Sequence, residues 1–330
     1  MPRVLVTGGA GYVGAVLVPK LLRGGFDVTV LDLYLYGEHV LDAVKDHPGL
    51  RQVKGDLRDV DLLNQIIPGC NAVIHLACIS NDPCFELDPE LGKSINHDAF
   101  RPLVETSRRH GVRRFVFASS SSVYGVKEEE QVTEELPVEP LTDYSRFKAI
   151  CEQELLEYGD PDFTCTILRP ATVCGYSPRL RLDLTVNILT NHAVNHRRIR
   201  VFGGSQFRPN IHIDDICDAY LQMLKLPEAQ VAGKIWNVGY ENLTVRQIAE
   251  RVRATIGDDE IEIVTEQTDD LRSYRVDSDL IGKEIGFHAQ RTVDDAIRDL
   301  INAFNDGRTP DSMTDMRYYN IRTMQAIGLK

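Results

Sequence analysis

The sequence predicts an α/β fold with a doubly wound parallel Rossmann sheet and a smaller C-terminal substrate-binding lobe. Short apolar runs alternate with amphipathic stretches in the first half of the chain, a glycine-rich turn follows the first run, and the pattern changes after Pro170. Such alternation is typical of parallel sheets covered by helices. We therefore expect one domain that contains the sheet over residues 1–170, joined by part of 206–238, and a lobe that spans mainly 171–330.

The order of the elements follows from the periodicity of the apolar residues. Strands are predicted at residues 3–8, 26–32, 72–77, 113–120 and 163–170. Helices are predicted at 12–24, 59–67, 90–110, 143–158 and 184–196, with another that begins at Asp214. The last ~20 residues are expected to be peripheral, because chain termini are commonly tied down least.

Charge and composition narrow the classes of function. Aspartate and glutamate total 49 against 37 lysines and arginines, for a formal net charge of -12 at pH 7. This charge repels polyanions, so neither nucleic acid nor an anionic membrane is an expected partner. The seven cysteines form no CxxC pair, which predicts reduced thiols and no metal site. With no signal sequence and no apolar run of membrane-spanning length, the expected compartment is the cytoplasm.

The first strand leads into a dinucleotide-binding pattern. The segment VTGGAGYVG places Gly8, Gly11 and Gly14 as GxxGxxG where a strand meets a helix. Glycines there permit a tight turn and close approach of a pyrophosphate to the helix N-terminus. Asp32 ends the second strand about 20 residues later, where a carboxylate accepts hydrogen bonds from the adenosine ribose. Residues 33–36 contain no arginine for a 2′-phosphate, so NAD is favoured over NADP.

A second pattern indicates proton transfer. Tyr144 and Lys148 form YxxxK, and four-residue spacing on a helix puts both side chains on one face. Free tyrosine has a pKa of about 10, so it needs a nearby cation to act as a base near neutral pH. The serine-rich segment 117–125 ends the preceding strand and presents hydroxyls at the edge of the sheet where ligands bind.

Together these motifs resemble the extended short-chain dehydrogenase/reductase family, specifically its NAD-dependent sugar-nucleotide epimerase and dehydratase branch, which includes the UDP-glucose 4-epimerases. The resemblance spans nearly the whole chain. Its supporting motifs are GDL (55–57), HLA (75–77), SINHDA (94–99), LRPATVCG (168–175) and RPNIHIDD (208–215).

The resemblance implies roles that composition does not show. Asp56 and Leu57 would flank the adenine, and Asn96 would support the catalytic region. Lys148 would also bond the nicotinamide ribose. Besides the glycines and Asp32, the implied cofactor-binding residues are Tyr12, Val13, Asp56, Leu57, Ala77, Asn96, Tyr144 and Lys148.

The family places an active-site serine or threonine three residues before the valine of VYG, which selects Ser120, with Ser119 and Ser121 as second choices. Ser120, Tyr144 and Lys148 are thus the predicted catalytic residues. A hydroxyl at Ser120 can bond the reacting sugar oxygen while Tyr144 exchanges its proton.

The substrate is expected to be a nucleotide-diphosphate sugar, held by residues that lie after the sheet. Guanidinium groups suit phosphates because they offer paired donors. Asn187 is the strongest candidate by resemblance, although a helix-capping role is the alternative. The predicted substrate-binding residues are Ser120, Thr172, Arg179, Arg181, Asn187, Arg208, Arg272 and Arg275.

The leading functional hypothesis is a sugar-nucleotide epimerase that acts by transient oxidation at C4 of the hexose. A C4 dehydrogenase or reductase of a nucleotide-linked sugar would use the same residues. A non-catalytic NAD-binding regulatory protein is the alternative from another class. Dehydration is disfavoured, because Ser121 and Ser122 occupy positions where the family's dehydratases carry an Asp-Glu pair. A homodimer through the helices at 90–110 and 143–158 is implied by the resemblance.

Overall fold

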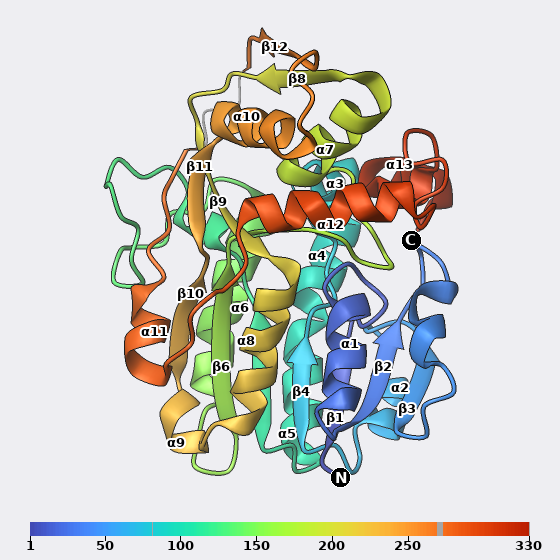
Figure 1. Ribbon diagram of the computed structural model, residues 1–330. Coiled ribbons are helices and arrows are strands. Elements are labelled where there is room, and N and C mark those ends of the chain that lie inside the picture. Colours follow the sequence, from blue (N-terminus) through green and yellow to red (C-terminus); the bar gives the residue numbers. More distant parts are fainter. Residues whose placement is uncertain (81, 269–272, 330) are drawn as a thin grey trace.

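A seven-stranded parallel sheet runs through the larger part of the molecule (Figure 1). The computed structural model describes residues 1–80, 82–268 and 273–329. The strand order is β10-β6-β5-β4-β1-β2-β3, so the winding changes direction between β1 and β4. The predicted fold class is confirmed. The strands are β1 (Arg3–Thr7), β2 (Asp27–Asp32), β3 (Leu50–Lys54), β4 (Ala72–His75), β5 (Arg114–Ala118), β6 (Thr164–Pro170) and β10 (Lys234–Val238).

The two faces of the sheet pack against different helices. In β1, Val4 and Val6 belong to the apolar core with α1 and α8, whereas Leu5 belongs to the core with α2, α5 and α6. Successive side chains of a strand point to opposite faces, so a continuous apolar strand contributes to both cores. The covering helices are α1 (Gly14–Arg23), α2 (Val60–Ile66), α5 (Phe100–Arg109), α6 (Asp143–Glu157) and α8 (Ile213–Lys225).

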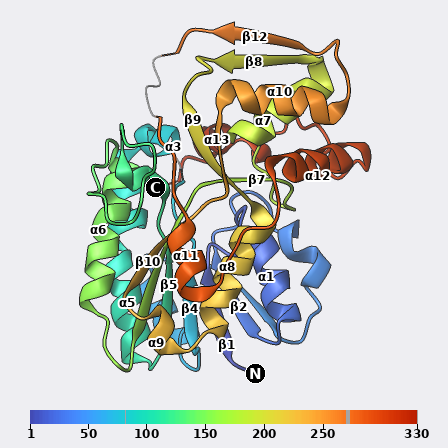
Figure 2. The same ribbon diagram turned by 60° about the vertical axis from the view of Figure 1, so that its left-hand side comes forward.

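The smaller lobe lies beyond the carboxyl ends of the strands (Figures 1 and 2). Its helices pack around a separate apolar core that contains Leu189, Ile248 and Ile297. The short strands form sheets of order β11-β9-β7 and β12-β8, which the sequence did not predict. The elements are β7 (Thr172–Cys174), α7 (Thr185–His196), β8 (Arg198–Phe202), β9 (Phe207–His212), β11 (Glu241–Thr244), α10 (Val245–Ile256), β12 (Glu262–Glu266) and α12 (Val293–Asn305).

Two elements that follow the first part of the smaller lobe in sequence belong to the larger unit, which contains the seven-stranded sheet. β10 pairs with β6 in parallel register, and α8 packs beside α1. Two short helices, α9 (Glu228–Val231) and α11 (Asp279–Ile285), flank β6 and β10. The larger unit of the fold is thus assembled from separate stretches of sequence.

The helix predicted at 90–110 is interrupted. It consists of α4 (Pro89–Lys93), a π-helical turn (Ser94–Asp98) and α5. Asn96 lies in the π turn with its side chain buried, and its amide bonds the main-chain N–H and C=O of Ile79 at 2.8 and 3.0 Å. The widened turn therefore holds the segment that follows β4, which is consistent with the frequent placement of π turns near functional sites.

The expectation that the last residues are peripheral is wrong. The final helix, α13 (Asn320–Ile327), packs against α3 (Asp82–Leu87) and places Met324 in an apolar cluster with Ile79 and Ile95. Figure 1 shows α13 at the junction of the two lobes, beyond the end of β2. Apolar side chains on one face of α13 bury themselves there, so packing outweighs the usual freedom of a terminus.

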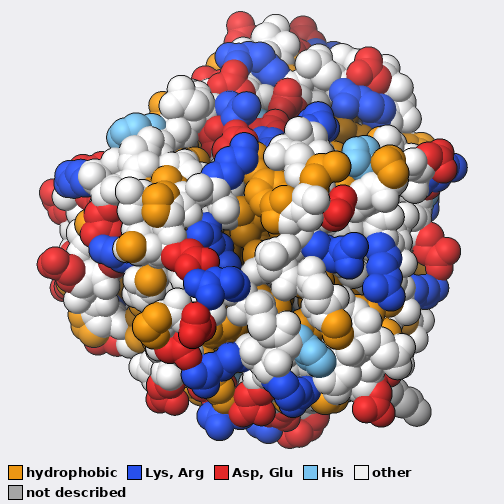
Figure 3. Space-filling model, turned by 90° about the horizontal axis from the view of Figure 1, so that it is seen from below, with side chains coloured by type: hydrophobic (Ala, Val, Ile, Leu, Met, Phe, Trp, Pro, Cys, Tyr) orange, Lys and Arg blue, Asp and Glu red, His pale blue; other side chains and the backbone are white. Residues whose placement is uncertain are grey.

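The distribution of surface charge and the lengths of the helices concern possible binding to polyanions and to membranes. Figure 3 shows acidic and basic side chains interspersed on the face that lies below in Figure 1. Within residues 1–80, 82–268 and 273–329, no helix combines the length and apolar character needed to cross a bilayer.

Candidate active site

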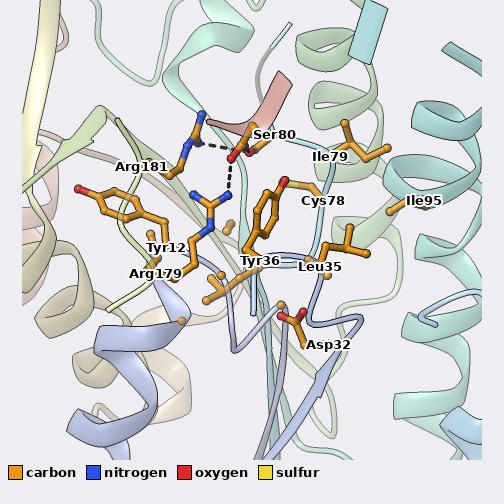
Figure 4. A pocket seen from close by; sticks show the side chains of 18 of the residues that line it. Tyr12, Asp32, Leu35, Tyr36, Cys78, Ile79, Ser80, Ile95, Arg179 and Arg181 are labelled. Carbon is orange, nitrogen blue, oxygen red and sulfur yellow. Dashed lines mark hydrogen bonds between the residues drawn. The ribbon is translucent and has the colours of Figure 1, made fainter. Parts of the chain in front are cut away.

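A cavity of about 380 Å³ opens at the carboxyl ends of the parallel strands (Figure 4). It lies where the winding of the sheet reverses, which is the usual ligand position in open α/β sheets. Of the residues predicted to bind the cofactor, those that line this cavity are Gly8, Gly11, Tyr12, Val13, Gly14, Asp32, Asp56, Leu57, Ala77, Tyr144 and Lys148. Asn96 is not among them, and instead supports the adjoining segment through Ile79.

The glycine turn is shaped by two close approaches. Gly8 has φ +74°, and a Cβ atom there would lie 2.6 Å from the main-chain nitrogen of Ala77. A Cβ at Gly14 would lie 2.5 Å from the carbonyl oxygen of Gly9. Neither distance is possible for a side chain, so both positions require glycine. The turn consequently brings the start of α1 to the cavity, where helix amides favour an anion.

Asp32 is fixed at the end of β2 by main-chain amides. Its Oδ2 accepts from the N–H of Ala10 at 2.9 Å, and its Oδ1 accepts from the N–H of Tyr34 at 2.7 Å. Burial raises the pKa of Asp32, although these two bonds act in the opposite direction. The carboxylate is therefore held rigidly in the cavity wall, where it can accept ribose hydroxyls and would repel a 2′-phosphate.

The predicted catalytic residues meet in this cavity. Ser120, Tyr144 and Lys148 all line it. The Lys148 ammonium donates to the carbonyl of Ala118 at 2.7 Å and lies 5.9 Å from the centre of the Tyr144 ring. Burial raises the pKa of Tyr144 well above its usual value, whereas Arg181 and a hydrogen bond with Ser120 act to lower it.

Local sequence explains how Tyr144 is placed. Thr142 and Ser145 form a reciprocal capping box at the start of α6, and Thr142 Oγ1 also donates to a carboxylate oxygen of Asp82 at 2.6 Å. Such caps satisfy amides that the first turn leaves unbonded. Tyr144 thus sits in a turn anchored both to its own helix and to α3.

The serines that follow β5 have different hydrogen-bond partners. The Ser119 hydroxyl donates to the buried carboxylate of Glu152, and the Ser121 hydroxyl lies 3.3 Å from that of Tyr274. Ser120 accepts hydrogen bonds from the main chain and the hydroxyl of Ser122, at 3.1 and 2.9 Å. Its hydroxyl hydrogen therefore remains available toward Tyr144 or a ligand.

A second cavity of about 230 Å³ adjoins the first. The two share Ser120 and Thr172 in their walls. A wall rich in hydroxyls can exchange hydrogen bonds with a polyhydroxylated ligand in either direction. The hydroxyl-bearing residues that line the second cavity are Ser120, Ser121, Ser122, Thr142, Ser145, Thr172, Thr185 and Tyr274.

The predicted substrate arginines are distributed over different places. Arg208 lines the second cavity. Arg275 lies over the ring of Phe207, 4.1 Å from its centre, and lines neither of the two cavities. Arg272 lies outside the described residues.

Arg179 and Arg181 line the first cavity rather than the second (Figure 4). Arg179 stacks on Tyr36, 3.6 Å from the ring centre, and burial lowers its pKa to about 10. Arg181 donates to Asp183 at 2.9 Å and to the Ser80 hydroxyl at 3.2 Å. Each guanidinium has one buried nitrogen with no hydrogen-bond partner among the described residues, Nε of Arg179 and Nη2 of Arg181.

Asn187 uses its side chain inside the protein. Its Oδ1 accepts from the N–H of Gly175 at 3.0 Å, and its Nδ2 donates to the carbonyl of Arg181 at 2.8 Å and to the Tyr12 hydroxyl at 3.1 Å. The residue is fully buried and lines neither cavity. It therefore connects the loop that carries the arginines to the glycine turn.

Sequence reasoning missed several residues that line the cavities. Tyr36 and Ser80 follow β2 and β4, so strand-end position is a signal that was available. Asp183 lies between the predicted arginines and Asn187. Asn320, Met324 and Leu329 also line the first cavity, but nothing in their local sequence indicates this.

Away from both cavities, the structure places His212, Asp214 and Asp299 with potential ligand atoms within 4.8 Å of one another. His212 Nε2 lies 3.2 Å from Asp299, and Asp214 pairs with Lys20 at 3.1 Å. His212 and Asp299 thus pair with each other, whereas the carboxylate of Asp214 pairs with a lysine outside the group.

Comparisons with known proteins match this chain to NAD-dependent epimerases and dehydratases. The sequence model of the NAD dependent epimerase/dehydratase family matches residues 4–239. A dTDP-glucose 4,6-dehydratase of Streptomyces niveus is 28% identical over 323 residues, covering 93% of this chain and 94% of that protein. A UDP-glucose 4-epimerase of Mycolicibacterium smegmatis is 29% identical over 311 residues, covering 92% and 98%.

The structure of DesIV, a dTDP-glucose 4,6-dehydratase of Streptomyces venezuelae solved with NAD bound, superposes with a TM-score of 0.83 at 26% identity, covering 92% of this chain and 98% of that one. A dehydratase and an epimerase thus match this chain at similar identity, so the comparisons establish the family and not the reaction. The chain belongs to the NAD-dependent epimerase/dehydratase family and is an NAD-dependent enzyme of the extended short-chain dehydrogenase/reductase type.

Proposed function

We propose that this enzyme is a sugar-nucleotide epimerase that acts by transient oxidation at C4 of the hexose. The observation that carries the proposal is the position of Ser120, which lies in the shared wall of the two cavities. Tyr144 and Lys148 line the first cavity beside it, and the second is rich in hydroxyls. A sugar bound in the second cavity could therefore place its reacting carbon beside Ser120, facing a dinucleotide bound in the first cavity.

The first cavity fits NAD. It combines the glycine turn, the amide-bound carboxylate of Asp32 and two nearly buried arginines, which suit a ribose and a diphosphate. Since Arg179 lines this cavity and not the second, we assign it to the cofactor diphosphate instead of the substrate. NAD bound there supplies the acceptor for the hydride from the sugar.

The protein's own groups manage the proton. Ser120 donates a hydrogen bond to the reacting sugar oxygen, and Tyr144 accepts the proton of that hydroxyl as the carbon is oxidised. Lys148 contributes a positive charge near the phenol, which favours its ionised form. The same proton returns from Tyr144 when the keto sugar is reduced on its other face, so no net redox change occurs.

Dehydration needs an additional acid and base, and the second cavity offers little for either. Its lining carries hydroxyls at Ser121 and Ser122, and Asp183 is the one carboxylate among the described residues that line it. Burial alone would raise the pKa of Asp183, but Arg181, Arg179 and the main-chain N–H of Asn320 together lower it. An ionised, paired carboxylate is a poor proton donor to a leaving hydroxyl near neutral pH, and its lowered pKa also makes it a weak base.

Proton NMR of the sugar product tests the proposal. Purified enzyme with NAD is incubated separately with UDP-, dTDP-, GDP- and CDP-linked hexoses, and Tyr144→Phe serves as the inactive control. We expect one sugar nucleotide to convert to its C4 epimer without lasting absorbance of reduced nicotinamide. A 4-keto-6-deoxy product would instead identify a dehydratase. Reduced nicotinamide that accumulates until a keto compound is added would identify a C4 dehydrogenase, and absence of any reaction or binding would favour the regulatory alternative.

A further inference from the structure

The last helix of the chain forms part of the wall of the first cavity. Asn320 and Met324 of α13, and Leu329 just beyond it, line that cavity together with residues from the first half of the chain. Figure 2 shows α13 beside α3, and the two helices pack against each other. A segment more than two hundred positions away in sequence thus completes the site that the glycine turn begins.

Asn320 connects the two loops that carry polar groups into the cavity. Its Nδ2 donates to the Ser80 hydroxyl at 2.9 Å, and its Oδ1 accepts from the guanidinium of Arg179. Its main-chain N–H donates to Asp183 at 3.1 Å. The residue is only 2% exposed, so these bonds are shielded from water. Within the described part of the chain, Arg179 donates hydrogen bonds to Asn320 and to a main-chain carbonyl and to no carboxylate. Asn320 therefore fixes the direction of the guanidinium without neutralising its charge.

Apolar side chains of the same segment close the cavity beside Asp32. Met324 packs in a cluster with Ile79 and Ile95, and Leu35 and Leu329 lie against that cluster. Leu35 follows β2 by a few residues, which places the cluster next to the predicted ribose-binding carboxylate. The cluster joins segments that follow β2 and β4 to the end of the chain.

We propose that α13 retains the cofactor during turnover, with Asn320 as a positioning residue that holds Arg179 toward the dinucleotide and Met324 as a wall of its adenosine half. The proposal rests on the assignment of the first cavity to NAD under the proposed function. A transient oxidation requires such retention, since the hydride must return to the same sugar before the reduced cofactor leaves. Dissociation of NAD then requires α13 to detach.

The size of α13 makes that detachment a discrete event. The helix has eight residues, and an isolated helix of that length is unstable in water. Its structure therefore depends on contacts with α3 and with Arg179 and Ser80. Segments held by few contacts open as local units with free energies below that of global unfolding. Weakening the contacts of α13 should raise the rate of opening and, with it, the rate of cofactor release.

The test measures release of NADH from Asn320→Ala and Met324→Ala enzymes. Each protein is loaded with NADH and mixed with excess NAD, and the loss of nicotinamide fluorescence gives the release rate. Gln325→Ala is the matched control, because Gln325 lies on the exposed face of the same helix. We expect release to accelerate about tenfold or more in both variants, given the usual value of buried hydrogen bonds and packed side chains.

The KM for the sugar nucleotide at saturating NAD should stay near that of the unaltered enzyme, and Gln325→Ala should release NADH at the original rate. A merely structural role would lower thermal stability without speeding release, so unchanged release in folded variants would overturn the proposal. As a measurement on the unaltered enzyme, amide hydrogen exchange over 320–329 should slow when NAD is added; no change would also overturn it. If the unaltered enzyme binds no NADH, the assignment of the cavity itself fails, which is a separate and recognisable result.

Discussion

Glu152 and Arg169 form a buried ion pair that is joined by two hydrogen bonds. Arg169 Nε and Nη2 donate to the two carboxylate oxygens at 2.9 and 2.6 Å, and the two side chains are 4% and 5% exposed. The same carboxylate accepts from Ser119, and Arg169 Nη1 donates to the Tyr124 hydroxyl at 2.7 Å. The pair therefore ties α6, which carries Tyr144 and Lys148, to the strand ends that carry the serines.

Removing one member of this pair should destabilise the fold severely. Glu152→Ala leaves the buried guanidinium of Arg169 without a counter-charge, and we expect the free energy of unfolding to fall by about 3–5 kcal/mol. Glu157→Ala, on the exposed face of the same helix, should change it by less than about 0.5 kcal/mol. Urea denaturation measures both. Equal stability of the two variants would show that the pair does not anchor α6.

Tyr144→Phe should lower turnover by about 100-fold or more, because it removes the group that accepts the proton. Binding of NAD should persist, since the phenyl ring still fills the same place in the cavity wall. Tyr158→Phe is the control, as Tyr158 lies at the far end of α6 with its hydroxyl on Glu105. Steady-state assays with circular dichroism as a check of folding decide the matter, and near-normal turnover would remove Tyr144 from the role.

Turnover should rise with pH. Burial raises the pKa of Tyr144 well above its usual value, and the phenolate is the form that accepts a proton. The active fraction therefore increases as the solution becomes more alkaline, over a range of roughly pH 6 to 9. Rate measurements across that range should show the rise in the unaltered enzyme, and the residual activity of Tyr144→Phe should lack it. A flat profile for the unaltered enzyme would contradict the assignment.

The enzyme should bind NAD more tightly than NADP. Asp32 is held by two main-chain amides in the cavity wall, where its charge repels a 2′-phosphate. Asp32→Ala should weaken NAD binding and narrow the difference between the two dinucleotides. Fluorescence titration with NADH and NADPH measures the ratio. A clear preference of the unaltered enzyme for the phosphorylated cofactor would refute the role of Asp32.

We further expect a homodimer in which α5 and α6 of two copies form a four-helix bundle, as the family resemblance implies. Both helices cover the same face of the sheet, so they can be presented together to a partner. Sedimentation velocity at micromolar concentration checks the prediction. A monomer under those conditions would count against it.

The sequence by itself determined the fold class and the local parts of the site. The glycine turn is specified by positions that no Cβ can occupy, and the relation of Tyr144 to Lys148 follows from one helix. Such constraints act over a few residues, so a short motif contains them. β3 escaped prediction because only Leu50 and Val53 in it are strongly apolar, which is too weak a pattern for an edge strand.

Only the tertiary structure decided which distant groups share a cavity. Residue type suggested Arg179, and the family resemblance suggested Asn187, as substrate-binding residues. Packing places Arg179 in the wall of the first cavity and turns the Asn187 side chain into the protein. Ser80 and Asn320 are 240 positions apart and share a hydrogen bond. A contact of that kind depends on how α13 packs against the distant helix α3, because the apolar face of α13 needs a partner from outside its own segment. The chemical type of each site residue can therefore be read from the local sequence, whereas the residues that surround it are determined by long-range packing.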